Sequence, residues 1–106
     1  IGNTYALKLR ILFKMTYEGH YNWETWNISL WLNNDQNMHN EAIRICKNTY
    51  EFAHHKTNAL ESYVFDLLDN NIITDKISIH RVNFKEIVKD FEDTIKEIKD
   101  YEENHV

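Results

Sequence analysis

The scarcity of helix-breaking residues most constrains what this chain can fold into. Its 106 residues include no proline and only two glycines, Gly2 and Gly19. Proline and glycine end helices and build tight turns, so a chain that nearly lacks them favours long helices over a turn-rich β architecture. With 42% hydrophobic residues it can bury one compact core, and its length leaves no room for a second domain. We predict an all-α domain, a small bundle of about four helices.

The N-terminal segment departs from this helical pattern. Apolar residues occupy every odd position from 5 to 17, which is the periodicity of a β-strand, yet no clear second strand follows. Three interpretations stay open: the segment pairs with a partner chain, it forms a hairpin or helix despite its pattern, or it is not native. We favour the third, with Met15 as the natural start, residues 1–14 as a non-native extension and residues 15–106 as the single helical domain.

The charge balance and the lone cysteine narrow the class of protein. There are 17 acidic and 12 basic residues, a formal charge of −5, and without Lys8, Arg10 and Lys14 the charge becomes −8. The basic residues are dispersed on an acidic chain, which gives no general attraction to phosphate, so we expect no direct nucleic-acid binding.

We predict neither a membrane span nor a signal peptide. Cys46 has no partner for an internal disulfide, which favours a reducing cytoplasm, that of a host cell if the protein is viral.

A tryptophan-rich segment after the N-terminal region is expected to form the central helix. Asn22 is a good N-cap, and apolar residues then point in nearly every direction down to Leu32, so we expect the helix and its tryptophans to be buried. The polar side chains between these apolar residues need hydrogen-bond partners if the helix is buried. Two alternatives stay open: they bond to a neighbouring backbone, or they line a small pocket. The candidate ligand-binding residues are Trp23, Glu24, Thr25, Trp26, Asn27 and Trp31.

Two further segments have helical periodicity. Asn33, Asn34 and Asp35 offer a turn and an N-cap for the first, whose apolar stripe runs over residues 38–52 and places Cys46 in the core. The second is expected to start at a polar cap, Thr57 or Asn58, and to stop at the asparagine pair 70–71. The mixed stretch that follows, residues 72–82, is expected to hold one or two helical turns.

The last helix is the best-marked element. Asn83 with Glu86 matches a capping box, and Val82 with Ile87 matches a hydrophobic staple. Apolar residues then repeat at alternating spacings of four and three, in a seam that packs on the other helices or on a second copy in a homodimer. The seam consists of Phe84, Val88, Phe91, Ile95 and Ile98, with Tyr101 near its continuation.

Acidic side chains dominate the rest of this helix, interspersed with lysines. One interpretation is an ordinary solvated face with i to i+4 ion pairs. The other is a surface that binds a partner protein, even one that mimics DNA phosphates and blocks a basic groove. The candidate partner-binding residues are Asp90, Asp93, Glu97 and Asp100.

We find no pattern that supports catalysis. The sequence lacks a phosphate-binding glycine loop, a nucleophile elbow, a paired-cysteine zinc motif and a His-Glu-x-x-His helix. His54 and His55 are adjacent and would point about 100° apart on a helix. His39 and Glu41 are two residues apart, so a helix would place them on different faces. We therefore expect no enzyme, no metal site and no cofactor.

Two segments resemble a known family of short proteins from tailed phages, archaeal viruses and related mobile elements. Residues 21–35, YNWETWNISLWLNND, resemble the family signature N-Y/W-E-T-W-N-V-x-L-W-I/L-x-N-D. Residues 82–87, VNFKEI, are similar to its V-N/D-W-x-E-I-A segment, with Phe84 in place of the usual tryptophan. The resemblance spans roughly residues 15 to 100. It implies a viral or prophage origin and an all-helical fold, and it supplies no catalytic residues because the family has no known function.

From these observations we expect a non-enzymatic accessory protein of phage type that acts by binding a host or viral protein. Such binding could inhibit a defence or regulatory factor. The alternative is a small-molecule binding or sensing domain that uses the tryptophan cluster.

Overall fold

The computed structural model describes residues 22–48 and 53–104, and these form an all-α fold. Four α-helices and one 3-10 turn follow each other in the described ranges: α2 (Trp23–Asn34), α3 (Gln36–Lys47), α4 (Ala53–Asp69), η1 (Ile79–Arg81) and α5 (Phe84–Asn104). The predicted helical bundle is confirmed, whereas the possible N-terminal strand and the extension over residues 1–14 lie outside the described residues. No helix in the described ranges combines the length and apolarity that crossing a bilayer requires.

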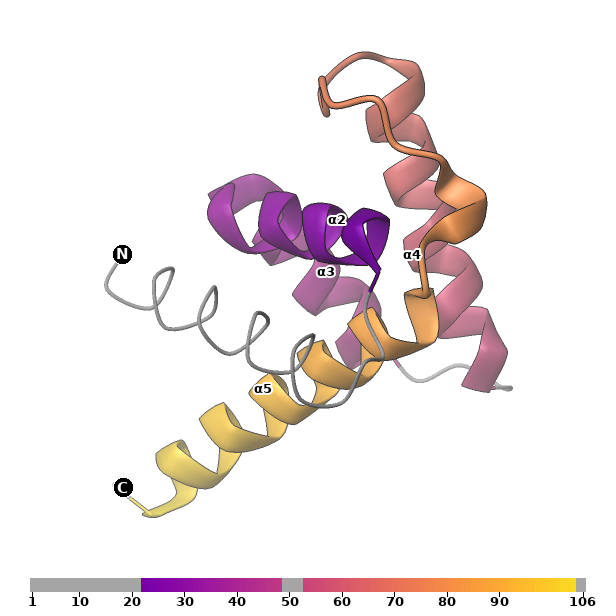
Figure 1. The fold of residues 1–106 in the computed structure, drawn as a ribbon. Coiled ribbons are helices and arrows are strands. Elements are labelled where there is room, and N and C mark those ends of the chain that lie inside the picture. The colour runs from indigo at the N-terminus through magenta and orange to yellow at the C-terminus, as the bar shows by residue number, and fades with distance from the viewer. Residues whose placement is uncertain (1–21, 49–52, 105–106) are drawn as a thin grey trace.

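Helix α5 is the element on which the others assemble. It packs against α2, α3 and α4, and α3 also lies between α2 and α4 (Figure 1). The N-terminal half of α5 contributes Phe84, Ile87, Val88 and Phe91 to the core, while its C-terminal half extends away from the other helices (Figure 1). The core therefore lies at one end of α5.

Short polar side chains begin the first two helices as predicted. The Asn22 side chain accepts a hydrogen bond from the Thr25 N–H at 2.8 Å, and the Asp35 side chain accepts one from the Met38 N–H at 2.9 Å. Each bond satisfies a donor that the first turn of a helix would otherwise leave open. A single residue, Asp35, thus separates α2 from α3 and turns the chain.

The end of α4 also follows from an asparagine. Asn71 has φ 55°, the left-handed conformation that asparagine tolerates better than most residues. The Asn71 N–H donates to the Leu68 carbonyl, and the Ile72 N–H donates to the Leu67 carbonyl at 2.9 Å. This pair of bonds is a Schellman motif, which confirms the predicted stop at the asparagine pair.

Two local predictions were wrong. Helix α4 begins at Ala53, ahead of the expected caps Thr57 and Asn58, because nothing in the polar stretch before them interrupts a helix. Trp23 is 50% exposed rather than buried, since it occupies the first position of α2 at the edge of the bundle. Trp26 and Trp31 are partly buried, and residues 49–52 of the stripe predicted to start at Met38 lie outside the described residues. The predicted core position of Cys46 is confirmed: it is 3% exposed, and burial raises the pKa of its thiol to about 11.

Candidate functional site

The N-terminal turn of α2 is fastened to the start of α5 by polar groups. The Thr25 hydroxyl accepts a hydrogen bond from the Asn83 N–H at 2.9 Å, and Thr25 is fully buried. The Asn22 amide donates to the Arg81 carbonyl at 2.6 Å, and the Glu24 carboxylate lies 4.0 Å from the Arg81 guanidinium. We call this group the α2–α5 latch: Asn22, Glu24, Thr25, Arg81 and Asn83.

The latch joins the two segments that carried the sequence resemblance. Residues 21–35 contain Asn22, Glu24 and Thr25, and residues 82–87 contain Asn83, so these segments, far apart in sequence, meet in the fold. Asn83 also accepts a hydrogen bond from the Glu86 N–H at 3.3 Å, which confirms its predicted role as the cap of α5. Thr25 therefore joins α2 to the start of α5, and the Glu24 side chain lies towards Arg81 of η1.

Among the described residues, the three tryptophans have different surroundings. Trp23 is half exposed, and Trp26 is partly buried with an indole N–H that has no hydrogen-bond partner among the described residues. Trp31 is partly buried and donates its indole N–H to the Asp75 carboxylate at 2.9 Å. Two of the six candidate ligand-binding residues, Asn27 and Trp31, line one pocket together, and the other four do not line that pocket.

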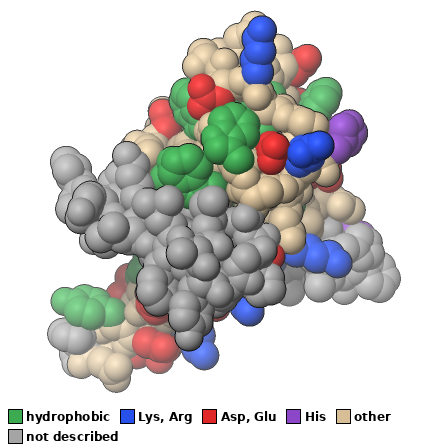
Figure 2. Space-filling model, in the orientation of Figure 1, with side chains coloured by type: hydrophobic (Ala, Val, Ile, Leu, Met, Phe, Trp, Pro, Cys, Tyr) green, Lys and Arg blue, Asp and Glu red, His purple; other side chains and the backbone are tan. Residues whose placement is uncertain are grey.

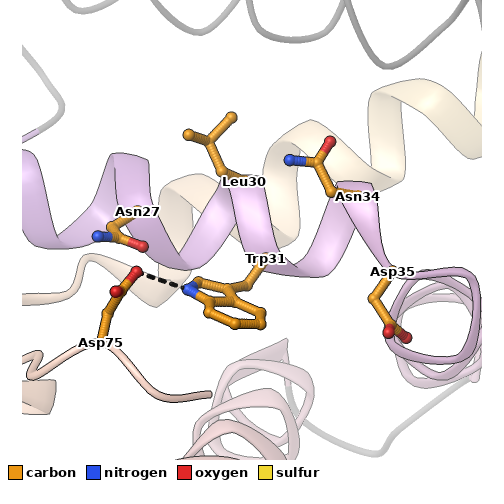
Figure 3. A pocket seen from close by; sticks show the side chains of 6 residues that line it. All are labelled: Asn27, Leu30, Trp31, Asn34, Asp35 and Asp75. Atoms are coloured by element: carbon orange, nitrogen blue, oxygen red, sulfur yellow. Dashed lines mark hydrogen bonds between the residues drawn. The ribbon is translucent and has the colours of Figure 1, made fainter. Parts of the chain in front are cut away.

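That pocket is an open groove of about 410 Å³ along one face of α2. Four of its residues are spaced three or four apart on the helix, and the other two come from the α2–α3 junction and from the loop before η1. Figure 3 shows Asp75 and Asp35 at opposite ends of the groove with Trp31 between them. The lining residues are Asn27, Leu30, Trp31, Asn34, Asp35 and Asp75.

Neither carboxylate of this groove was predicted from the sequence as a site residue. Asp35 was predicted only as part of a turn with a helix cap, and it is the residue that caps α3. Asp75 lies 44 residues from its partner Trp31, in a stretch without clear periodicity, so no local pattern connects the two. The only signal available was the indole of Trp31, whose N–H usually finds a partner when it is buried.

The four candidate partner-binding acids share one side of α5. Asp90, Asp93, Glu97 and Asp100 are spaced by three, four and three residues, which places them along one stripe of an α-helix. Asp90 and Asp93 are partly buried, whereas Glu97 and Asp100 are exposed. Along the adjacent stripe, Ile98 and Tyr101 are also exposed. Figure 2 shows acidic and hydrophobic side chains close together at this end of the molecule.

His39 and Glu41 face different surroundings, as their spacing predicted. The His39 ring lies 5.7 Å from the Phe91 ring, and Glu41 forms an ion pair with Arg44 on the surface. No group of three or more potential metal ligands occurs in the described parts of the chain. The arrangement around His39 is that of a histidine packed into the edge of the core.

Burial should make the stability of the fold depend on the charge of His39. Burial lowers the pKa of His39, and a hydrogen bond with the Leu32 backbone opposes this effect in part. Because the unfolded state then binds the proton more tightly, the free energy of unfolding should fall as the pH drops through about 6.5 towards 5. Urea denaturation at pH 7.5, 6.5 and 5.5 measures this loss.

The variant His39→Gln should lose part of that pH dependence, whereas His80→Gln, a change at an exposed position of η1, should keep it. If the two variants show the same pH profile as the unaltered protein, the dependence does not originate at His39.

Comparisons with known proteins add a family but no activity. No curated protein and no solved structure matches this chain significantly. The model of one family, described as a family of unknown function (DUF7249), matches residues 13–104. The match covers all four described helices and both sides of the latch. The chain therefore belongs to the DUF7249 family.

Proposed function

We propose that this protein is a non-enzymatic binding module that docks on another protein through the C-terminal half of α5. The observation that carries the proposal is that the apolar seam of α5 continues past the core. Phe91 is buried, Ile95 is partly buried, and Ile98 and Tyr101 are 47% and 63% exposed. The C-terminal half of α5 adds little to the core, yet it exposes a large apolar and an aromatic side chain. Exposed side chains of this kind can bind a partner protein.

The charge beside this seam indicates the kind of partner. Residues 90–103 contain seven acidic and two basic side chains, and the four stripe acids lie beside the exposed seam. A partner with a basic rim around an apolar groove would gain association rate and specificity from the charges and affinity from the apolar contact. From the resemblance to viral proteins we extend the proposal to a phage-type accessory protein that acts on a host factor in the host cytoplasm.

Affinity capture from a host lysate tests this proposal, with the full chain as bait. We expect a protein that the unaltered bait retains at low salt and releases at about 0.5 M salt, where screening weakens charge attraction. The double variant Ile98→Ser, Tyr101→Ser should lose it. The matched control is Ile72→Ser, since Ile72 is 52% exposed but lies after α4, and it should retain the partner. Retention by the double variant would contradict the proposal.

A second candidate function, small-molecule binding, is favoured by one observation in the α2 groove. Asn27 is only 9% exposed and lines the groove, and no hydrogen bond of its side chain is found among the described residues. Its amide atoms are not among the fully buried polar atoms without a partner, so they stay open to the groove, where a ligand can hydrogen-bond with them. This candidate uses α2 and is independent of the α5 surface.

A further inference from the structure

The α2 groove has the chemistry of a cation site. Its two ionisable residues are Asp35 and Asp75, both acids, and its lining includes no lysine, arginine or histidine. The ion pairs found among the described residues join other side chains, so neither carboxylate is neutralised by a neighbouring lysine or arginine there. Two uncompensated carboxylates in one concave surface produce a negative potential that attracts positive ligands.

Each carboxylate keeps accepting capacity for a ligand. One oxygen of Asp35 accepts the Met38 N–H, and one oxygen of Asp75 accepts the Trp31 indole N–H. These bonds fix the two side chains in place, while a carboxylate can accept about four hydrogen bonds in total. The carboxylates are thus preorganised without being saturated.

The groove between the carboxylates completes the site. Asn27 lines the groove beside Asp75, and its side-chain amide oxygen is an acceptor for a ligand N–H (Figure 3). The partly buried Leu30 and Trp31 offer an apolar wall, and the indole face of a tryptophan is the aromatic surface that attracts cations most strongly. The groove thus has hydrogen-bond acceptors at its two ends and an apolar wall between them. This arrangement is complementary to an alkyl chain that carries positively charged groups with several N–H donors.

We propose that the α2 groove binds an organic cation with an ammonium or guanidinium group on an aliphatic chain, and that Asp35, Asp75, Asn27 and Trp31 recognise it. Such a group comes either as a free alkyl diamine or as the lysine or arginine side chain of a protein. A diamine carries one positive group at each end of its chain, and the two carboxylates lie on opposite sides of Trp31 (Figure 3). The inference rests on the second candidate function and names its ligand class.

Titration followed by the indole N–H resonances of the ¹⁵N-labelled full chain tests the inference. Three tryptophans give three indole signals, and Trp31→Phe identifies the one from the groove. We expect 1,4-diaminobutane to shift the Trp31 signal saturably, and 1,4-butanediol, its uncharged counterpart, to have no effect. A second arm uses N-acetyl-arginine methylamide; tighter binding of this probe than of the diamine points to a protein side chain as the source, and the reverse points to a free diamine.

Charge-removing variants then locate the cation. Asp75→Asn keeps an acceptor for the Trp31 N–H, and Asp35→Asn keeps a good helix cap, so both should fold while weakening binding about threefold to tenfold. The matched control Asp69→Asn removes an exposed acid at the end of α4 and should leave the affinity unchanged.

The possible failures are distinguishable. Equal binding of the butanediol would overturn the cation inference but leave a small-molecule site in the groove. The absence of any saturable shift would overturn both. Equal weakening by Asp69→Asn would show that the overall negative charge, and not the groove, attracts the cation, and would also overturn the inference.

Discussion

Replacing Ile87 by alanine is expected to lower the free energy of unfolding by about 2–5 kcal/mol. Ile87 is 1% exposed at the start of α5, where it packs with Val82 in the core that all four helices share. Truncation removes buried methyl and methylene groups and leaves a cavity that the neighbouring helices fill only partly. Urea denaturation followed by circular dichroism measures the change, and the lost stability should appear as a lower midpoint with an unchanged slope.

Ile98→Ala is the matched control for this prediction. It makes the same substitution in the same helix, but Ile98 is 47% exposed and lies on the part of α5 beyond the core. Its cost should stay below about 1 kcal/mol, since surface substitutions away from special features have small effects. Similar losses for the two variants would mean that the C-terminal half of α5 is part of the folding core, and the protein-binding proposal would lose its basis.

Thr25→Val should destabilise the domain by about 1–3 kcal/mol even though valine has nearly the same shape. The substitution removes the hydroxyl that accepts the Asn83 N–H, so a partly buried donor at the start of α5 loses its partner. The hydrogen bond from Asn22 to the Arg81 carbonyl would remain, but it joins the start of α2 to η1 and not to α5. The midpoint of urea denaturation measures the loss.

Thr25→Ser separates the hydrogen bond from packing. Serine keeps the hydroxyl and loses one methyl group, so it should retain more stability than the valine variant. The opposite order, with serine less stable than valine, would show that Thr25 acts through its methyl group and that its bond to Asn83 contributes little.

The helix ends could be predicted because their causes are local. Asn22, Asp35 and Asn83 each bond to a backbone N–H three residues later, and Asn71 adopts its left-handed conformation within the Schellman turn. All of these bonds lie within a few residues, so the sequence pattern contains them. The start of α4 was missed because a polar residue can cap a helix or continue one, and its local sequence does not decide which.

The roles of the α2 side chains could not be predicted in full, because they depend on distant residues. The sequence indicated that Thr25 and Asn27 need partners and offered two solutions, a neighbouring backbone or a pocket. The structure assigns the first to Thr25, whose partner is 58 residues away, and places Asn27 in the groove with Asp75. When a helix is apolar nearly all round, its sequence does not show which face packs against the core. Trp23 was therefore predicted to be buried, whereas it is half exposed.

The position of α5 in the chain has a consequence for synthesis on the ribosome. This helix is the last of the described helices, yet it contacts α2, α3 and α4, and its cap residue Asn83 supplies the backbone N–H that Thr25 accepts. The three helices made before it can pack on one another chiefly through α3, and the core faces that α5 covers stay exposed until it is synthesised. A chain that stops before Asn83 therefore exposes these faces to chaperones and proteases.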